Sequence, residues 1–118
     1  MKSGHRIALV LDPAFGKDLS RLGAVNHTWI VDSEANAEAG DAPEGGVTTF
    51  RPGESAEEDA AYLLRVIDEH HGATSGFPPL SSVEVWGVGL TPEVSDVAGE
   101  LGLRTVEETA TGFIARRA

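Results

Sequence analysis

The alternation of short apolar runs with stretches of helical period is the feature that most restricts the fold. The run RIALVLD at 6–12 is apolar, partly β-branched and closed by the turn signal Asp12-Pro13, which is typical of a buried strand. Further runs of this kind lie at 27–32, 47–50 and 83–90. We therefore expect a strand at each of these positions.

The clearest helical pattern follows the third run. Ser55 and Glu58 have the S-x-x-E spacing of a capping box, and Gly72 is a natural stop. An apolar stripe at helical spacing lies between them, formed by Ala60, Leu63, Leu64 and Ile67. This pattern predicts an amphipathic helix from Ser55 to His71.

Two other segments have a helical pattern. One begins with Thr91 as N-cap and Pro92 at the first helical position, and Gly102 ends it. The other is a shorter pattern at 15–22, directly after the first strand. We expect a helix at both places, so that helices alternate with strands.

This order predicts an α/β fold, Rossmann-like in its alternation, with the sequence β-α-β-β-α-β-α-β-β. Alternating elements favour a three-layer or two-layer sandwich around a mainly parallel sheet of about five or six strands. The tail RTVEETATGFIARR predicts a C-terminal β-hairpin with Thr111-Gly112 in the turn. We expect one domain over 1–118, with long surface loops at 33–46 and 72–82.

The charge restricts the possible partners. Nineteen acids against nine bases give a net charge of −10, and the sequence shows no basic cluster beyond Arg116-Arg117. Nucleic acids and anionic membranes are disfavoured because both need cations. The acidity suits a basic protein partner or a cation, and it also keeps a cytoplasmic protein soluble.

The chain has no cysteine, which excludes disulfides and thiolate metal sites. We read no signal peptide in MKSGHRIALVLDPAFG, because its apolar run soon meets Asp12. No run approaches the ~20 apolar residues of a membrane span. We expect a cytoplasmic protein.

Polar residues follow the predicted strands at the edge where α/β ligands bind. Asp12 ends the first strand, Asp32 ends the second and Arg51 follows the third, while Phe15 and Ser33 lie beside them in the chain. Paired carboxylates there could hold Mg²⁺ or raise one another's pKa. The alternative is that strand-end aspartates cap turns.

The run Asp68-Glu69-His70-His71 resembles a metal site, but it ends a helix. In a β-α-β unit that end lies at the amino edge of the sheet, so the histidines should not reach Asp12 or Asp32. Imidazoles in a last helical turn satisfy free carbonyls. We expect no metal; the weak candidates are His5, Asp68 and His71.

Glycine and tryptophan occur together in the fourth predicted strand. Gly87 and Gly89 would let another backbone or a ligand approach the strand closely beside Trp86. The alternative is that they let a helix pack closely on the sheet. We expect Trp29 and Trp86 in the core, on faces covered by helices.

Known catalytic and cofactor motifs are missing. DPAFGKD follows the first strand where a dinucleotide site needs G-x-G-x-x-G, and there is neither a phosphate-binding P-loop nor a G-x-S-x-G elbow. The opening strand with its terminal acid resembles that of receiver-type phosphoacceptor domains. However, TTFRP and VGLTP lack the Asp and Lys which that family requires. We expect no cofactor and no catalytic residue.

Three functions remain open. The first is a non-catalytic interaction module of the adaptor or toxin-neutralising type that binds a basic protein. The second is a small ligand-binding domain or enzyme with a phosphate or divalent-cation site at the carboxyl ends of the strands. The third is a structural homo-oligomer that pairs through the edge of the C-terminal hairpin.

Overall fold

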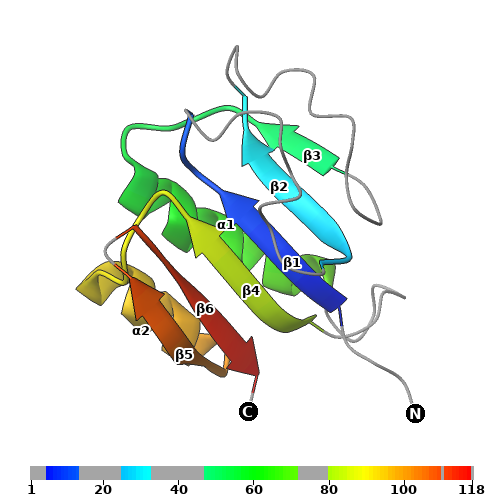
Figure 1. Ribbon diagram of the computed structural model, residues 1–118, viewed down its shortest axis with the longest axis vertical. Coiled ribbons are helices and arrows are strands. Elements are labelled where there is room, and N and C mark those ends of the chain that lie inside the picture. The colour runs from blue at the N-terminus through cyan, green and yellow to red at the C-terminus, as the bar shows by residue number, and fades with distance from the viewer. Residues whose placement is uncertain (1–4, 14–24, 33–46, 72–79, 110, 118) are drawn as a thin grey trace.

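The computed structural model describes residues 5–13, 25–32, 47–71, 80–109 and 111–117, which form one mixed sheet of six strands and two helices. The α/β fold is therefore confirmed (Figure 1). In chain order the elements are β1 (His5–Val10), β2 (His27–Val31), β3 (Val47–Phe50), α1 (Ala56–His70), β4 (Leu80–Trp86), α2 (Pro92–Glu100), β5 (Leu103–Thr109) and β6 (Gly112–Arg117). The helix predicted at 15–22 and the loop predicted at 33–46 lie outside the described residues.

The strand order across the sheet is β3-β2-β1-β4-β6-β5. The four strands from β3 to β4 are parallel, whereas β6 is antiparallel to both β4 and β5. The expectation of a mainly parallel sheet is thus only partly correct. The short connection between β5 and β6 permits only an antiparallel pair, and β6 then inserts between β5 and β4.

Both described helices begin as the sequence predicts. The Ser55 side chain accepts a hydrogen bond from the Glu58 backbone N–H (3.1 Å), and the Thr91 hydroxyl accepts one from Val94 (3.3 Å). Each cap satisfies a backbone N–H that has no partner within the helix. Just past α2, Gly102 adopts a positive φ of 76°, which ends the helix.

The fourth strand differs from its prediction. It was expected at 83–90, but β4 runs from Leu80 to Trp86. Gly87 has a φ of 102°, outside the range of an extended strand, so the ladder ends there. Residues 80–82, predicted as part of the loop 72–82, belong to β4, and the rest of that loop lies outside the described residues.

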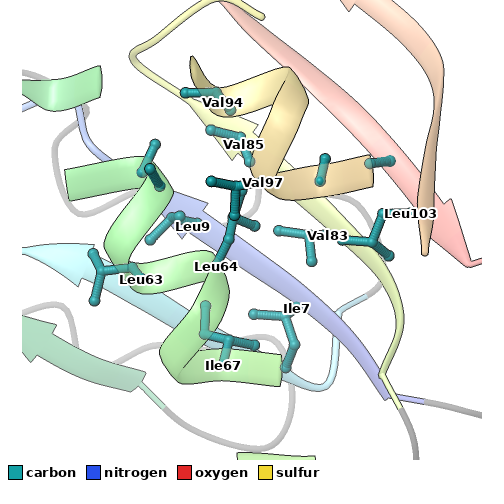
Figure 2. Packing of buried hydrophobic residues seen from close by; sticks show 14 of the residues in the cluster. Ile7, Leu9, Leu63, Leu64, Ile67, Val83, Val85, Val94, Val97 and Leu103 are labelled. Carbon is teal, nitrogen blue, oxygen red and sulfur yellow. The ribbon is translucent and has the colours of Figure 1, made fainter. Parts of the chain in front are cut away.

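The main core lies between α1, α2 and one face of the sheet (Figure 2). Alternate residues of the strands point into it, including Ile7 and Leu9 of β1 and Val83 and Val85 of β4. Leu64 of α1 is fully buried against them. Burying each of these large side chains contributes about 1.5–3 kcal/mol.

The two described helices cover the same face, so the described part has one helical layer (Figure 1). Ala8, Val10 and Ile30 point to the opposite face, where they form a second, smaller buried cluster with Val25. None of the helices in the described segments has the length and apolarity that crossing a membrane requires.

Candidate functional site

The carboxyl ends of β1, β2 and β3 lie side by side. Pairing of β1 with β2 matches Val10 with Ile30, and pairing of β2 with β3 matches Val31 with Phe50. Continuing these registers by one or two residues brings Asp12, Asp32 and Arg51 onto neighbouring strand ends, which in a sheet are about 4.8 Å apart. Asp12 is half-buried, while Asp32 and Arg51 are exposed. Phe15 and Ser33 lie outside the described residues.

The glycine after β4 explains how β1 and β4 meet at this edge. The backbone N–H of Leu11 donates to the carbonyl of Trp86 (2.7 Å), and a Cβ on Gly87 would lie 2.6 Å from the backbone nitrogen of Asp12. The approach expected beside Trp86 is therefore that of another backbone. The expectation that Gly87 lies inside a strand is wrong.

The histidines at the end of α1 contact a tryptophan. The rings of His70 and Trp29 meet edge to face with centroids 5.9 Å apart, and His27 meets Trp29 in the same manner at 6.3 Å. His27 Nε2 lies 2.6 Å from the Thr48 hydroxyl. Trp29 packs against the main core beneath α1, as predicted. His70 thus meets the middle of β2 and not its carboxyl end.

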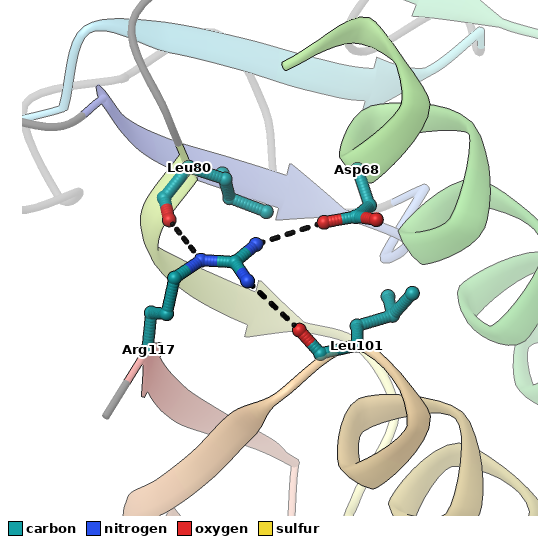
Figure 3. A network of polar contacts seen from close by, with 4 residues as sticks. All are labelled: Asp68, Leu80, Leu101 and Arg117. Atoms are coloured by element: carbon teal, nitrogen blue, oxygen red, sulfur yellow. Dashed lines mark hydrogen bonds and ion pairs between the residues drawn. The ribbon is translucent and has the colours of Figure 1, made fainter. Parts of the chain in front are cut away.

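Asp68 has a structural partner. Its carboxylate accepts a hydrogen bond from Nη2 of Arg117 (2.8 Å), while the same guanidinium donates to the carbonyls of Leu80 and Leu101 (Figure 3). Within the described ranges, no three histidines or acids are arranged to hold a metal ion. Asp68 is therefore held by Arg117, and the side chain of His5 lies outside the description.

Acidic side chains crowd where the two helices begin. Glu57, Glu58 and Asp59 lie in the first turn of α1, and Glu93 lies in the first turn of α2. A hydrogen bond with the Glu57 carboxyl raises the pKa of Glu93 above its ordinary value. Desolvation and the charges of Glu57 and Glu58 raise this pKa further, and Arg65 partly opposes them.

A hollow of about 460 Å³ opens on the sheet over β4, β6 and β5. Side chains on its face alternate with those that point into the main core, so it lies on the face of the sheet opposite α1 and α2. Its lining residues are Glu84, Val85, Trp86, Glu107, Thr109, Thr111, Gly112, Phe113 and Ile114. Pockets for small ligands have volumes of about 300–1,000 Å³.

Two cross-strand rows build this hollow. In one row Ile114 of β6 pairs with Glu84 on one side and Glu107 on the other, so a half-buried apolar side chain lies between two carboxylates. In the next row Gly112 separates Trp86 from Thr109. A Cβ on Gly112 would collide with the backbone carbonyl oxygen of Val85, so this glycine lets the backbones of β6 and β4 approach closely at the floor of the hollow.

The tryptophan in the hollow is held by one of the acids. The Trp86 indole N–H donates a hydrogen bond to the carboxylate of Glu84, two residues earlier on the same strand. Trp86 is half-buried, faces away from α1 and α2, and packs against the second buried cluster on the opposite face of the sheet. The segment predicted as a helix at 15–22 lies outside the described residues, so the expected cover of Trp86 by a helix stays a prediction. The pairing of β6 with β4 places Trp86 beside the hairpin.

Sequence reasoning missed this site, although part of the signal was present. Two-residue spacing puts Glu84 and Trp86 on one face of a strand. The hairpin is confirmed, but the predicted turn at Thr111-Gly112 is wrong by one residue, because Gly112 is the first residue of β6 and pairs with Thr109. This register pairs Glu107 with Ile114. The sequence does not say that β6 lies against β4 and not against another strand. Comparison with known protein families, curated proteins and solved structures finds no match to this chain.

Proposed function

We propose that this protein is a non-catalytic interaction module, of the adaptor or toxin-neutralising type, which binds a basic segment of a partner protein at the hollow. The observation that carries this proposal is a half-buried tryptophan, Trp86, in a hollow that two carboxylates, Glu84 and Glu107, also line. Aromatic faces and carboxylates both attract organic cations. The net charge of −10 draws a basic partner toward the whole surface.

A long basic side chain fits the chemistry of the two rows. Its aliphatic stem can lie on Ile114, while its guanidinium or ammonium group reaches the carboxylates of Glu84 and Glu107. The hydrogen bond from Trp86 to Glu84 orients the indole ring. Arginine suits this site better than lysine, because a planar guanidinium stacks on an aromatic ring and binds a carboxylate with two N–H groups.

The test is a titration with an arginine-rich peptide, followed by NMR at the indole N–H groups. We expect the Trp86 signal to shift in a saturable manner while the Trp29 signal stays in place. Glu107→Gln should weaken peptide binding about fivefold or more, because the peptide cation loses roughly 1 kcal/mol of binding free energy.

Glu108→Gln is the matched control. Glu108 is adjacent to Glu107 and carries the same charge, but it pairs with the core residue Phe113 and so lies on the helix-bearing face. Equal losses in the two variants would mean attraction by net charge alone and would contradict a site at the hollow.

A second candidate is a phosphate or divalent-cation site at the carboxyl ends of the strands. The registers that bring Asp12, Asp32 and Arg51 onto neighbouring strand ends favour it. Mg²⁺ or a nucleotide should then raise the melting temperature of the parent protein, and Asp12→Ala with Asp32→Ala should abolish the rise. Identical thermal shifts in the parent and the variant would remove this candidate.

Self-association through the hairpin edge has less support. β5 is an edge strand, as this idea requires, but a bulge between Thr105 and Glu107 disturbs its ladder. Glu107 and Glu108 would also bring acids close to acids if two copies of β5 paired, which is a common protection of edge strands. Light scattering at low and high salt separates a dimer from a monomer.

A further inference from the structure

A line of basic residues crosses the sheet next to the hollow. Arg6 of β1 pairs with Ser82 of β4, Ser82 pairs with Arg116 of β6, and Arg116 pairs with Arg104 of β5. All three arginines are exposed and Ser82 is half-buried. Directly paired residues share a face of a sheet, so strand pairing assembles a basic row from distant parts of the sequence.

The two arginines of the hairpin lie directly opposite each other. Cβ atoms of such a pair are about 4.5–5.5 Å apart, and like charges at this distance destabilise a sheet. Among the described residues, neither Arg104 nor Arg116 forms an ion pair, although Arg65 pairs with Glu100 and Arg117 with Asp68. In a chain of 19 acids, two facing guanidinium groups without an acidic partner are unexpected.

We propose that Arg104 and Arg116, with the hydroxyl of Ser82, form a binding site for a single phosphoryl dianion. A dianion neutralises both guanidinium groups at once and so removes their repulsion. Guanidinium groups match the oxygens of a phosphate through paired N–H donors, and the hydroxyl supplies a further donor. Arg6, on the other side of Ser82, extends the row.

The surroundings restrict the ligand to one phosphoryl group. Glu84 lies two residues after Ser82 on β4, about 6.6 Å along the strand. Glu107 lies three residues after Arg104 on β5, but the bulge places it opposite Ile114, which is only two residues from Arg116, the partner of Arg104. The charges of the two carboxylates repel a second phosphate, so an extended nucleic-acid backbone does not fit here. Inorganic phosphate and the monoester of a small molecule share the chemistry that does fit.

This site is distinct from the hollow in both ligand and residues. The hollow uses carboxylates to hold a cation, whereas the arginine row holds an anion. Loss of one site therefore does not imply loss of the other: Glu107→Gln tests the hollow, and Arg104→Gln and Arg116→Gln test the arginine row.

The experiment is an NMR titration of the full chain with inorganic phosphate and, separately, with O-phosphoserine at constant ionic strength. We expect saturable shifts of the backbone amides of Ser82, Arg104 and Arg116. Arg104→Gln and Arg116→Gln should each weaken binding about fivefold or more, as the loss of a charged hydrogen bond predicts. Arg116→Lys should retain part of the affinity, because it keeps the charge but loses the planar fork.

Arg65→Gln is the charge-matched control, since Arg65 lies on α1 and away from this face. It should leave phosphate binding unchanged. A stronger response to O-phosphoserine than to phosphate identifies a phosphomonoester as the ligand, and an equal response identifies the free ion. Shifts that stay linear with concentration, or an equal loss in Arg65→Gln, overturn the proposal.

Discussion

Arg117 in the last strand forms an ion pair with Asp68 in α1, with Nη2 and Oδ1 2.8 Å apart. Its Nε and Nη1 also donate to the carbonyls of Leu80 (2.8 Å) and Leu101 (3.1 Å). One guanidinium therefore connects the start of β4 with the ends of both helices. The histidines beside Asp68 do not take part in these contacts.

Replacing Arg117 should destabilise the fold. Arg117→Met keeps most of the aliphatic stem and removes three hydrogen bonds, each worth about 0.5–1.5 kcal/mol. Because the side chains of Arg117 and Asp68 are 39% and 31% exposed, solvent screens the ion pair. We expect a loss of about 1–2 kcal/mol in urea unfolding. Arg116→Met, one residue earlier on the other face, should stay within about 0.5 kcal/mol of the parent.

Removing the hydroxyl group of Thr28 should stabilise the folded protein. The residue is fully buried in β2, and its Oγ1 has no hydrogen-bond partner in the part of the chain that the structure describes. Burying an unpaired hydroxyl costs about 1–3 kcal/mol, and valine has nearly the same shape. Thr28→Val should therefore raise the free energy of unfolding by about 1 kcal/mol, and Thr28→Ser should lower it because a methyl group is lost. A lower melting temperature in Thr28→Val would mean that the hydroxyl has a partner after all.

Local signals in the sequence predicted local structure well. Both N-caps, Ser55 and Thr91, are confirmed because a cap depends only on residues within one turn. The end of β4 was misplaced because the positive φ of Gly87 follows from the backbone of Asp12, a residue 75 positions away in the chain.

The sites depend on strand order, which no local signal contains. Glu84 and Glu107 flank Ile114, and Ser82 and Arg104 flank Arg116, only because β6 inserts between β4 and β5. The sequence showed no basic cluster for the same reason: Arg6, Arg104 and Arg116 become neighbours through pairing alone. Asp12 and Asp32 were easier to relate, because parallel strands that are close in the chain end at one edge.

The raised pKa of Glu93 predicts a pH dependence of stability. The folded protein holds this proton more tightly than the unfolded chain does, so stability falls as the pH rises from the ordinary value of 4.5 to the raised one. Glu93→Gln cannot ionise and should lack this fall. The urea midpoint of Glu93→Gln minus that of the parent protein should therefore increase as the pH rises from about 4 to about 7. Glu108→Gln, an exposed acid on β5, should show no such trend.

Two glycines with positive φ should respond differently to alanine. Gly87 and Gly102 have φ values of 102° and 76°, so each substitution costs about 1–2 kcal/mol of backbone strain. At Gly102 the new Cβ meets only the flexible Arg117 side chain at 3.6 Å, whereas at Gly87 it lies 2.6 Å from the backbone nitrogen of Asp12. Gly87→Ala should therefore lose clearly more stability in urea unfolding than Gly102→Ala, because β1 and β4 must move apart. Equal losses in the two variants would show that the strand ends can separate at no cost, which would contradict the close contact between Gly87 and Asp12.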